Sequence, residues 1–403
     1  MKNFFLFGIA IALLFVFILF CQSMHPQNEK INALEHERNA EEHQKNAEEH
    51  EFNVDQTYAV SNAPLKKPNQ HPTEADPLHD SERIVERKYT SDEFQAGINL
   101  LVYGHPDMAN ARQLFKDLSE LGFNSLAIAF PLFQDDWQAD HVKTDPESTP
   151  TIAELTDLID AAHEQDLSVV LRPILDEQSI ISSGHWRGTI QPRNSHAWFE
   201  SYGTLLLQYA QLSEVTGVKW FNIGTELNSL QSDHAEWIDL IQSIRKIYRG
   251  KLMYSFNWNS VNDIRESPFV SQLDYVGIDA YFPLDAPDDA TVEMLKASWE
   301  IWIDQLSDIL RDQTIVVTEA GIIPIAGAYR TPYAWSIPEG QIDWQAQAHY
   351  YEATYVSWKP FIDGIYWWNV TLDESTANTI DFSPLGSPTE AVIQKYFLKA
   401  RNR

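Results

Sequence analysis

Short β-rich runs alternate with helical runs from about Tyr89 onward, and this alternation constrains the fold more than any other feature. Eight runs are short, apolar and rich in β-branched or aromatic residues, which is typical of buried strands. They are Ile98–Tyr103, Ser125–Phe130, Ser168–Leu175, Trp220–Glu226, Met253–Asn257, Tyr275–Tyr281, Ile315–Glu319 and Gly364–Trp368. Eight strands that alternate with helices over about 315 residues predict an α/β protein with a (β/α)8 barrel.

The runs between these strands show helical spacing of their apolar residues. In Ala111–Leu121, for example, Leu114, Phe115, Leu118 and Leu121 fall on one face. A doubly wound sheet is the alternative α/β fold, but it normally carries a glycine-rich first turn. Here the glycine of Gly97–Leu100 begins a strand instead of following one. We therefore favour the barrel.

Two glutamates close two of the predicted strands. Glu226 follows Gly224-Thr225 at the end of the fourth strand, and Glu319 follows Thr318 at the end of the seventh. Catalytic residues of (β/α)8 barrels lie at the carboxyl ends of the strands, so we expect these two side chains to face each other across the mouth. A pair of carboxyl groups, one protonated and one ionised, is the machinery of glycoside hydrolysis.

Other strand ends carry residues suited to a sugar, whose C–H faces stack on aromatic rings and whose hydroxyls need polar partners. The expected substrate-binding residues are Asn99, Arg172, Trp186, Asn257, Trp258, Tyr281 and Trp368. Of the adjacent Trp367 and Trp368, strand alternation lets only one face the barrel axis, and we favour Trp368. Arg172 and Asp176 flank the end of the third strand and are expected either to form a positioning ion pair or to contact substrate.

Charge and motif content exclude several classes. The chain has 58 acidic and 29 basic residues, a net charge of −29, and this sign is opposite to that of a nucleic-acid-binding surface. The first 88 residues contribute −5, so −24 belongs to residues 89–403 and would repel an anionic glycan. The predicted domain contains no metal-ligand spacing, G-x-S-x-G elbow or Walker A motif, so no metal or cofactor is expected.

The first 88 residues differ from the rest in composition. Residues 4–20 are an unbroken apolar run, so residues 1–23 are interpreted as a signal peptide or a signal anchor, with lipidation at Cys21 a further alternative. Each of these readings predicts an extracytoplasmic protein, which is membrane-anchored through residues 4–20 or secreted. Residues 24–88 read as a flexible or helical spacer. Its seven-residue repeat aligns His36, His43 and His50, which suggests a solvated stalk or, alternatively, a metal-binding face.

Several segments together resemble glycoside hydrolase family 113, the β-mannanase-like enzymes of clan A. The resemblance covers roughly residues 95–370, and its main segments are Trp186–Pro192, Gly224–Leu227, Asn257-Trp258, Asp274–Pro283 and Thr318-Glu319. Many clan A relatives carry Asn immediately before the acid/base, where this chain has Thr225. The residue after Arg172-Pro173 is Ile174, where the family is expected to carry His.

By this resemblance, Glu226 matches the acid/base and Glu319 the nucleophile. The implied reaction is retaining hydrolysis of β-1,4-mannosidic linkages in mannan or manno-oligosaccharides, with a neutral polysaccharide or oligosaccharide as the partner. Residues 89–403 would form the catalytic domain. Two alternatives stay open: another clan A β-glycosidase that acts on glucan or xylan, and a catalytically silent surface carbohydrate-binding barrel.

Overall fold

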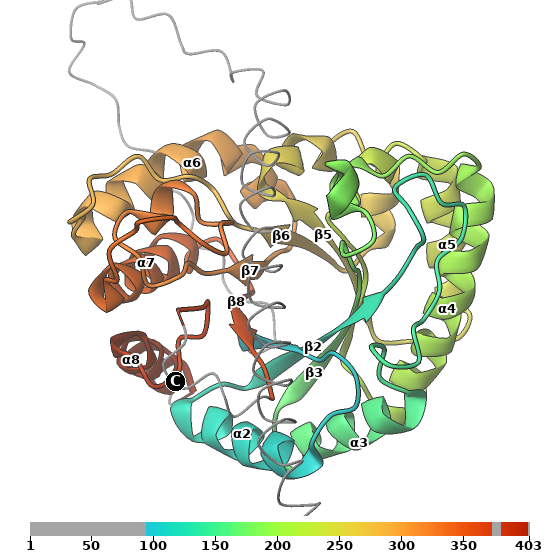
Figure 1. Cartoon of the computed structure of the whole chain (residues 1–403), viewed down its shortest axis with the longest axis horizontal. Helices are drawn as coiled ribbons and strands as arrows, with labels where there is room; N and C mark the ends of the chain where they lie inside the picture. The colour runs from blue at the N-terminus through green and yellow to red at the C-terminus, as the bar shows by residue number, and fades with distance from the viewer. Residues whose placement is uncertain (1–93, 373–379, 402–403) are drawn as a thin grey trace, which may run out of the picture. The chain divides into compact units, whose positions relative to one another are not determined.

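The computed structural model describes residues 94–372 and 380–401, which form a closed barrel of eight parallel strands surrounded by helices (Figure 1). The strands are β1 Gln95–Leu101, β2 Ser125–Leu132, β3 Ser168–Leu175, β4 Trp220–Thr225, β5 Lys251–Asn257, β6 Tyr275–Asp279, β7 Ile315–Ala320 and β8 Gly364–Val370. Each strand pairs with the next in sequence, and β8 pairs with β1 to close the barrel. The predicted (β/α)8 fold is thus confirmed.

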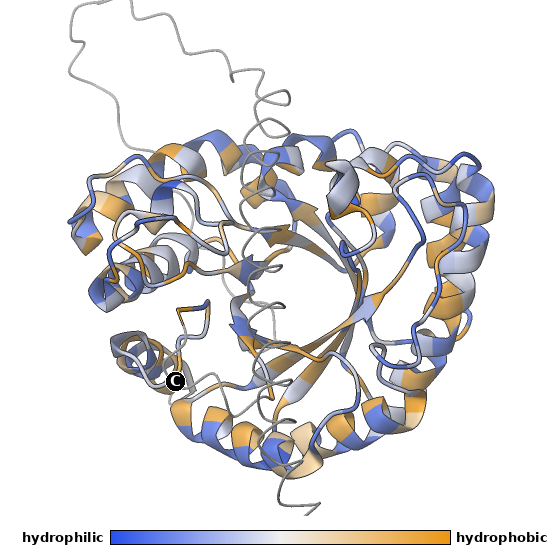
Figure 2. Ribbon diagram, in the orientation of Figure 1, coloured by the Kyte–Doolittle hydropathy of each residue, from blue (hydrophilic) through white to orange (hydrophobic). Residues whose placement is uncertain are grey.

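An α-helix follows every strand except β5, after which come two 3₁₀ helices, Trp258–Ile264 and Pro268–Gln272, and the α-helices cover the outside of the barrel. They are α2 Met108–Leu121, α3 Ile152–His163, α4 Ser195–Thr216, α5 His234–Arg245, α6 Val292–Asp312, α7 Trp344–Trp358 and α8 Pro388–Arg401. Figure 2 shows hydrophobic residues along the strands and mixed hydrophobic and hydrophilic residues along the helices. This distribution is expected of helices that bury one side against a sheet and expose the other.

Local sequence determines where the helices begin. Asp107 caps α2 by accepting hydrogen bonds from the amides of Ala109 and Asn110. Thr151 and Glu154 form a capping box at the start of α3. Such caps satisfy amides that have no partner inside the helix, and each contributes about 1 kcal/mol. The helices therefore start at defined residues just beyond the loops that follow the strands.

The amino-terminal half of the barrel interior is filled by a compact apolar cluster. Its members are Ala127, Val170, Trp220, Met253, Tyr275, Val316 and Tyr366. Tyr366 donates a hydrogen bond to Gln95, and a Cβ at Gly97 would lie 2.2 Å from its ring. Glycine is therefore required beside this tyrosine. The cluster forms a solid floor beneath the mouth, as is usual for barrels of this type.

The predicted strand boundaries were correct for β3 and differed by a few residues elsewhere. β4 ends at Thr225 and not at Glu226, because Glu226 has a φ of 56°, which an extended strand does not allow. β6 ends at Asp279 and not at Tyr281. Both corrections move a functional candidate from the strand itself to the first residues after it.

The signal segment, the spacer and the histidine repeat lie outside the described residues. Among residues 94–372 and 380–401, no helix is sufficiently long and apolar to span a bilayer.

Candidate active site

Glu226 and Glu319 lie at the carboxyl ends of β4 and β7, where the barrel opens. The Glu226 side chain is 14% exposed and the Glu319 side chain 7% exposed, so both carboxyl groups are largely withdrawn from water. The backbone amide of Glu226 donates to the carbonyl oxygen of Ser255, a bond that ties the residue to β5 despite its positive φ. A non-glycine residue held in this region of φ is a strained position of the kind found at functional sites.

Two donors hold the carboxyl group of Glu319. Arg172 Nη2 lies 2.6 Å from Oε1, and the hydroxyl of Tyr281 donates to Oε2 at 2.8 Å. Tyr281, which was expected among the substrate-binding residues, thus bonds directly to one of the two glutamates. Burial and the neighbouring Glu319 raise the pKa of Tyr281 well above its usual value, so the phenol stays protonated and remains a donor. The Glu319 carboxyl group is fixed at both oxygens.

Arg172 connects five strands of the barrel. Its guanidinium contacts Glu319 and Asp279, the latter at 3.0 Å, and it donates to Asn99 Oδ1 at 2.9 Å and to Thr225 Oγ1 at 3.3 Å. One of the two alternatives for Arg172 and Asp176, an ion pair between them, is not found: Arg172 pairs with Glu319 and Asp279. Strand alternation turns Arg172 into the barrel, whereas Asp176 lies beyond the strand end and accepts a hydrogen bond from Tyr103.

Asn99 and Arg172 were expected to contact substrate, and the structure places both beneath the carboxyl groups instead. Asn99 is fully buried, and its amide donates to the carbonyl oxygens of Thr318 and Trp367. Arg172 is 1% exposed. Because their polar atoms are engaged by the protein, these two residues support the site and do not line its surface.

Asp279 is a third buried carboxyl group in this layer. Its Oδ1 accepts from Thr318 and Arg172, but its Oδ2 has no hydrogen-bond partner among the described residues. Burial and the neighbouring Glu319 raise the pKa of Asp279 to about 7, against the opposing effect of Arg172. One guanidinium is thus shared between two carboxyl groups, and only Glu319 faces the mouth.

The electrostatic surroundings of Glu226 differ from those of Glu319. Burial and the charge of Asp279 raise the pKa of Glu226 well above its usual range, and Glu319 and Glu177 add to this effect. Arg187 acts in the opposite direction, with its Nε 4.0 Å from Glu226 Oε2. Glu226 therefore has the surroundings of a carboxyl group that keeps its proton to higher pH than an exposed glutamate does.

Aromatic side chains lie near the carboxyl ends of several strands and in the segments beyond them. Trp367 stacks on Tyr351 of α7 and so points outward, which leaves Trp368 on the inward side as the alternation predicts. Trp368 meets the exposed Trp335 edge-on at 6.5 Å. Trp258 stacks parallel to Tyr333, with the ring centroids 6.2 Å apart. Two ring pairs, Trp335 with Trp368 and Trp258 with Tyr333, thus lie at and beyond the carboxyl ends of the strands.

The remaining expected residues lie at a strand end or in the segments that follow the strands. Asn257 ends β5, and its buried Oδ1 has no hydrogen-bond partner among the described residues. Trp186 is half-buried, and its ring packs directly on Gly188. The roles of Trp186, Asn257, Trp258 and Trp368 toward a substrate stay predictions.

Sequence reasoning assigned no role to two charged residues of this site. Asp279 lies two residues after Gly277 in β6, and residues two apart in a strand point to the same face. The strand pattern therefore predicts that Asp279 points inward. Arg187 lies in the Trp186–Pro192 segment that bears the family resemblance, but its partner Glu177 is ten residues away and no local pattern links them. Only the fold brings Arg187 to Glu226.

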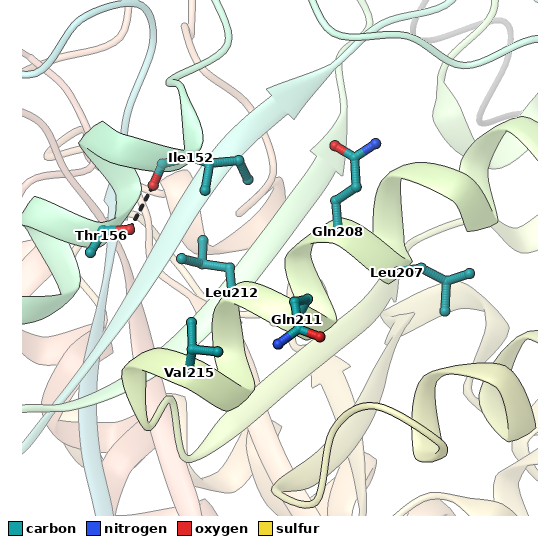
Figure 3. Close-up of a pocket in the computed structure, with 7 residues that line it drawn as sticks. All are labelled: Ile152, Thr156, Leu207, Gln208, Gln211, Leu212 and Val215. Atoms are coloured by element: carbon teal, nitrogen blue, oxygen red, sulfur yellow. Dashed lines mark hydrogen bonds between the residues drawn. The ribbon is translucent and has the colours of Figure 1, made fainter.

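The rest of the described structure differs from this site. The described residues contain no cluster of three or more His, Cys, Asp or Glu residues that could hold a metal ion. An open hollow on the outer helices is lined by Ile152, Thr156, Leu207, Gln208, Gln211, Leu212 and Val215 of α3 and α4 (Figure 3). None of these side chains is ionisable, and the hydroxyl of Thr156 donates to the carbonyl oxygen of Ile152.

A (β/α)8 barrel with two buried glutamates at the ends of β4 and β7 has the active-site architecture of a glycoside hydrolase. The model of Glycoside Hydrolase Family 113 matches residues 102–381, and the chain belongs to this family. It is accordingly a clan A glycoside hydrolase that acts on O-glycosyl bonds.

Solved structures share this fold. The GH113 β-mannanase AaManA from Alicyclobacillus acidocaldarius is 22% identical, with a TM-score of 0.66 over 77% of this chain and 99% of that one. A second structure, described as a GH113 β-1,4-mannanase, is 24% identical, with a TM-score of 0.66 over 76% of this chain and 99% of that one. No curated protein matches the chain.

Proposed function

We propose that this protein is a retaining β-mannanase that cleaves β-1,4-mannosidic linkages in mannan or manno-oligosaccharides. The observation that carries the mechanism is the asymmetry of the two carboxyl groups. Glu319 is held by Arg172 and Tyr281, whereas burial and Asp279 raise the pKa of Glu226. Paired carboxyl groups with different surroundings take different roles in catalysis. The proposed substrate is supported by the solved family members described as β-1,4-mannanases.

In the first step of the proposed reaction, Glu319 attacks the anomeric carbon as a carboxylate and forms a glycosyl ester. Glu226 donates its proton to the departing glycosidic oxygen. In the second step Glu226, now a carboxylate, removes a proton from water, and the water oxygen attacks the anomeric carbon and releases Glu319. Tyr281 and Arg172 fix the attacking carboxyl group, and the surrounding aromatic rings offer faces on which sugar rings can stack.

The test is product analysis with β-mannan, glucomannan, cellulose and xylan as separate substrates. We expect oligosaccharide products from the two mannose-containing polymers, and NMR should first show the β-anomer, because double displacement retains configuration. Glu319→Gln should lower turnover by at least about 10³-fold. As a control, this variant should still fold and bind mannan.

Other outcomes select the alternatives. Preferential cleavage of cellulose or xylan would show that the protein is another clan A β-glycosidase, which acts on glucan or xylan. Binding of mannan without cleavage would indicate a silent carbohydrate-binding barrel. If Glu319→Gln matched the wild type, the assignment of the nucleophile would be wrong.

A further inference from the structure

The segment between β3 and α4 builds a fixed position for one arginine. Glu177 Oε1 accepts a hydrogen bond from the backbone amide of Arg187 at 3.1 Å and a second from its Nε at 2.9 Å. One carboxyl group therefore fixes both the main chain and the side chain of Arg187. Both side chains are mostly covered, with 23% of Glu177 and 18% of Arg187 exposed.

The surrounding turn restricts Arg187 further. The amide of Thr189 donates to the carbonyl oxygen of Trp186 at 2.9 Å, and a Cβ at Gly188 would lie 2.3 Å from the Trp186 ring. The turn that carries Arg187 is thus closed by a backbone hydrogen bond and covered at Gly188 by the indole ring. The Nε of Arg187 lies 4.0 Å from Glu226 Oε2, a distance at which an opposite charge strongly favours an ionised carboxyl group.

The position of Arg187 matters because the other charged groups around Glu226 do not favour ionisation of its carboxyl group or are engaged elsewhere. Asp279 of β6, Glu319 of β7 and Glu177 all oppose ionisation of Glu226. Arg172 of β3 is engaged by Glu319 and Asp279, and the phenol of Tyr281 is directed at Glu319. Arg187 forms the only ion pair found for Glu226 among the described residues.

We propose that Glu177 and Arg187 form a positioning pair that holds a guanidinium beside Glu226 and makes this carboxyl group a competent proton donor. The inference rests on the proposed function of Glu226 as acid/base. When Glu226 releases its proton to the leaving oxygen, it becomes a buried anion among other carboxyl groups, and the fixed cation stabilises that anion. Glu177 limits this effect by neutralising part of the cation's charge.

The pair predicts opposite effects for two conservative substitutions. Arg187→Gln removes the cation and should make Glu226 ionise at higher pH. Glu177→Gln keeps a side-chain oxygen as acceptor but removes a negative charge, so Glu226 should ionise at lower pH. Arg187→Lys keeps the charge and should lie between Arg187→Gln and the wild type. A loop that mattered only for folding would move all three variants in the same direction.

Catalysis adds a second readout. Protonation by Glu226 matters for a sugar leaving group but little for 2,4-dinitrophenolate, which departs without it. Arg187→Gln should therefore lower kcat/KM for mannotriose by about 10-fold or more, and for 2,4-dinitrophenyl β-mannoside much less. Arg193→Gln is the matched control, since Arg193 lies in the same segment and 59% of its side chain is exposed.

The deciding experiment is a carboxyl ¹³C NMR titration of Glu226 in the full chain, assigned by comparison with Glu226→Gln and needing no substrate. Opposite displacement of its midpoint by Arg187→Gln and Glu177→Gln supports the proposal. An unchanged midpoint, or displacement of both variants in one direction, overturns it. Failure of the wild type to cleave any glycoside would instead refute the proposed function, and the two failures are distinguishable.

Discussion

At the scale of single residues, the site gives different surroundings to two glutamates that are the same residue type in the sequence. Glu319 receives two donors, whereas Glu226 is buried near Asp279, which raises its pKa. The sequence predicted both glutamates because each closes a strand. It did not predict the charged neighbours that distinguish them, since Arg172, Asp279 and Arg187 come from distant segments that only the closed barrel brings together.

The raised pKa of Glu226 predicts a pH-dependent cost in stability. A carboxyl group whose pKa is higher in the folded than in the unfolded chain stabilises the fold at low pH and loses this contribution as pH rises through the folded-state pKa. Each unit of difference corresponds to about 1.4 kcal/mol. Glu226→Gln should therefore match the wild type in free energy of unfolding near pH 4 and exceed it near pH 8. Urea unfolding at both pH values measures this.

Glu120→Gln is the control, because Glu120 is an exposed residue of α2 and its substitution should change stability little at either pH. A wild type that is more stable than Glu226→Gln near pH 8 would contradict the prediction.

Arg172 should be the residue of this site whose loss most affects stability. Arg172→Met leaves Glu319 and Asp279 buried without their shared cation, and breaking a buried ion pair in this way costs about 3–5 kcal/mol. Denaturant unfolding should show this loss. The double variant Arg172→Met with Asp279→Asn should recover part of it, because one uncompensated charge is gone. Equal stability of Arg172→Met and the wild type would show that the buried network contributes nothing.

At the scale of elements, the alternation of side chains along each strand explains which predictions succeeded. Trp367 and Trp368 were assigned to opposite faces correctly, because a period of two is visible in sequence. The same period turns Asn99 and Arg172 inward, but it does not tell how deep they lie. Depth depends on the stagger between strands, and this is why both were expected at the surface of the site and are found beneath it.

The end of β4 provides a test of how an element positions a catalytic group. A Cβ at Gly224 would lie 2.6 Å from the ring of Tyr254, so Gly224→Ala must displace either the strand end or the ring. We expect a loss of about 1–3 kcal/mol in stability. We also expect a lower kcat, because Glu226 follows two residues later and catalysis is sensitive to small displacements. Thermal unfolding and steady-state kinetics report the two effects.

Gly203→Ala in α4 is the matched control. A Cβ there would lie 3.2 Å from the end of the Leu240 side chain, which can move, and alanine has the higher helix propensity. This variant should be as stable as the wild type or slightly more stable, with unchanged kcat. Equal behaviour of the two alanine variants would contradict a specific role for Gly224.

At the scale of the whole molecule, the charge of −24 on residues 89–403 belongs to the segment that contains the barrel. Long-range repulsion should slow the approach of a polyanion and leave a neutral polymer unaffected. We expect kcat/KM for carboxymethylated mannan to rise as salt is increased from about 0.01 M to about 0.15 M, because the Debye length falls from about 30 Å to about 8 Å.

The same salt series with unmodified mannan should give a nearly constant kcat/KM. A steep salt dependence for both polymers would show that the effect comes from the enzyme itself. Faster cleavage of the charged polymer at low salt would contradict the expected repulsion.

The closure of the barrel by β1 and β8 also has a consequence for attachment. The amide of Gln95 bonds to the carbonyl oxygen of Asp363, so the described chain enters at the amino-terminal rim, beneath the apolar floor. The carboxyl groups of Glu226 and Glu319 lie at the opposite rim, where the barrel opens. A solid support or fusion partner joined just before Phe94 would therefore hold the barrel by its closed end and leave its open end free to receive long polymers. This geometry suits the protein to oriented immobilisation.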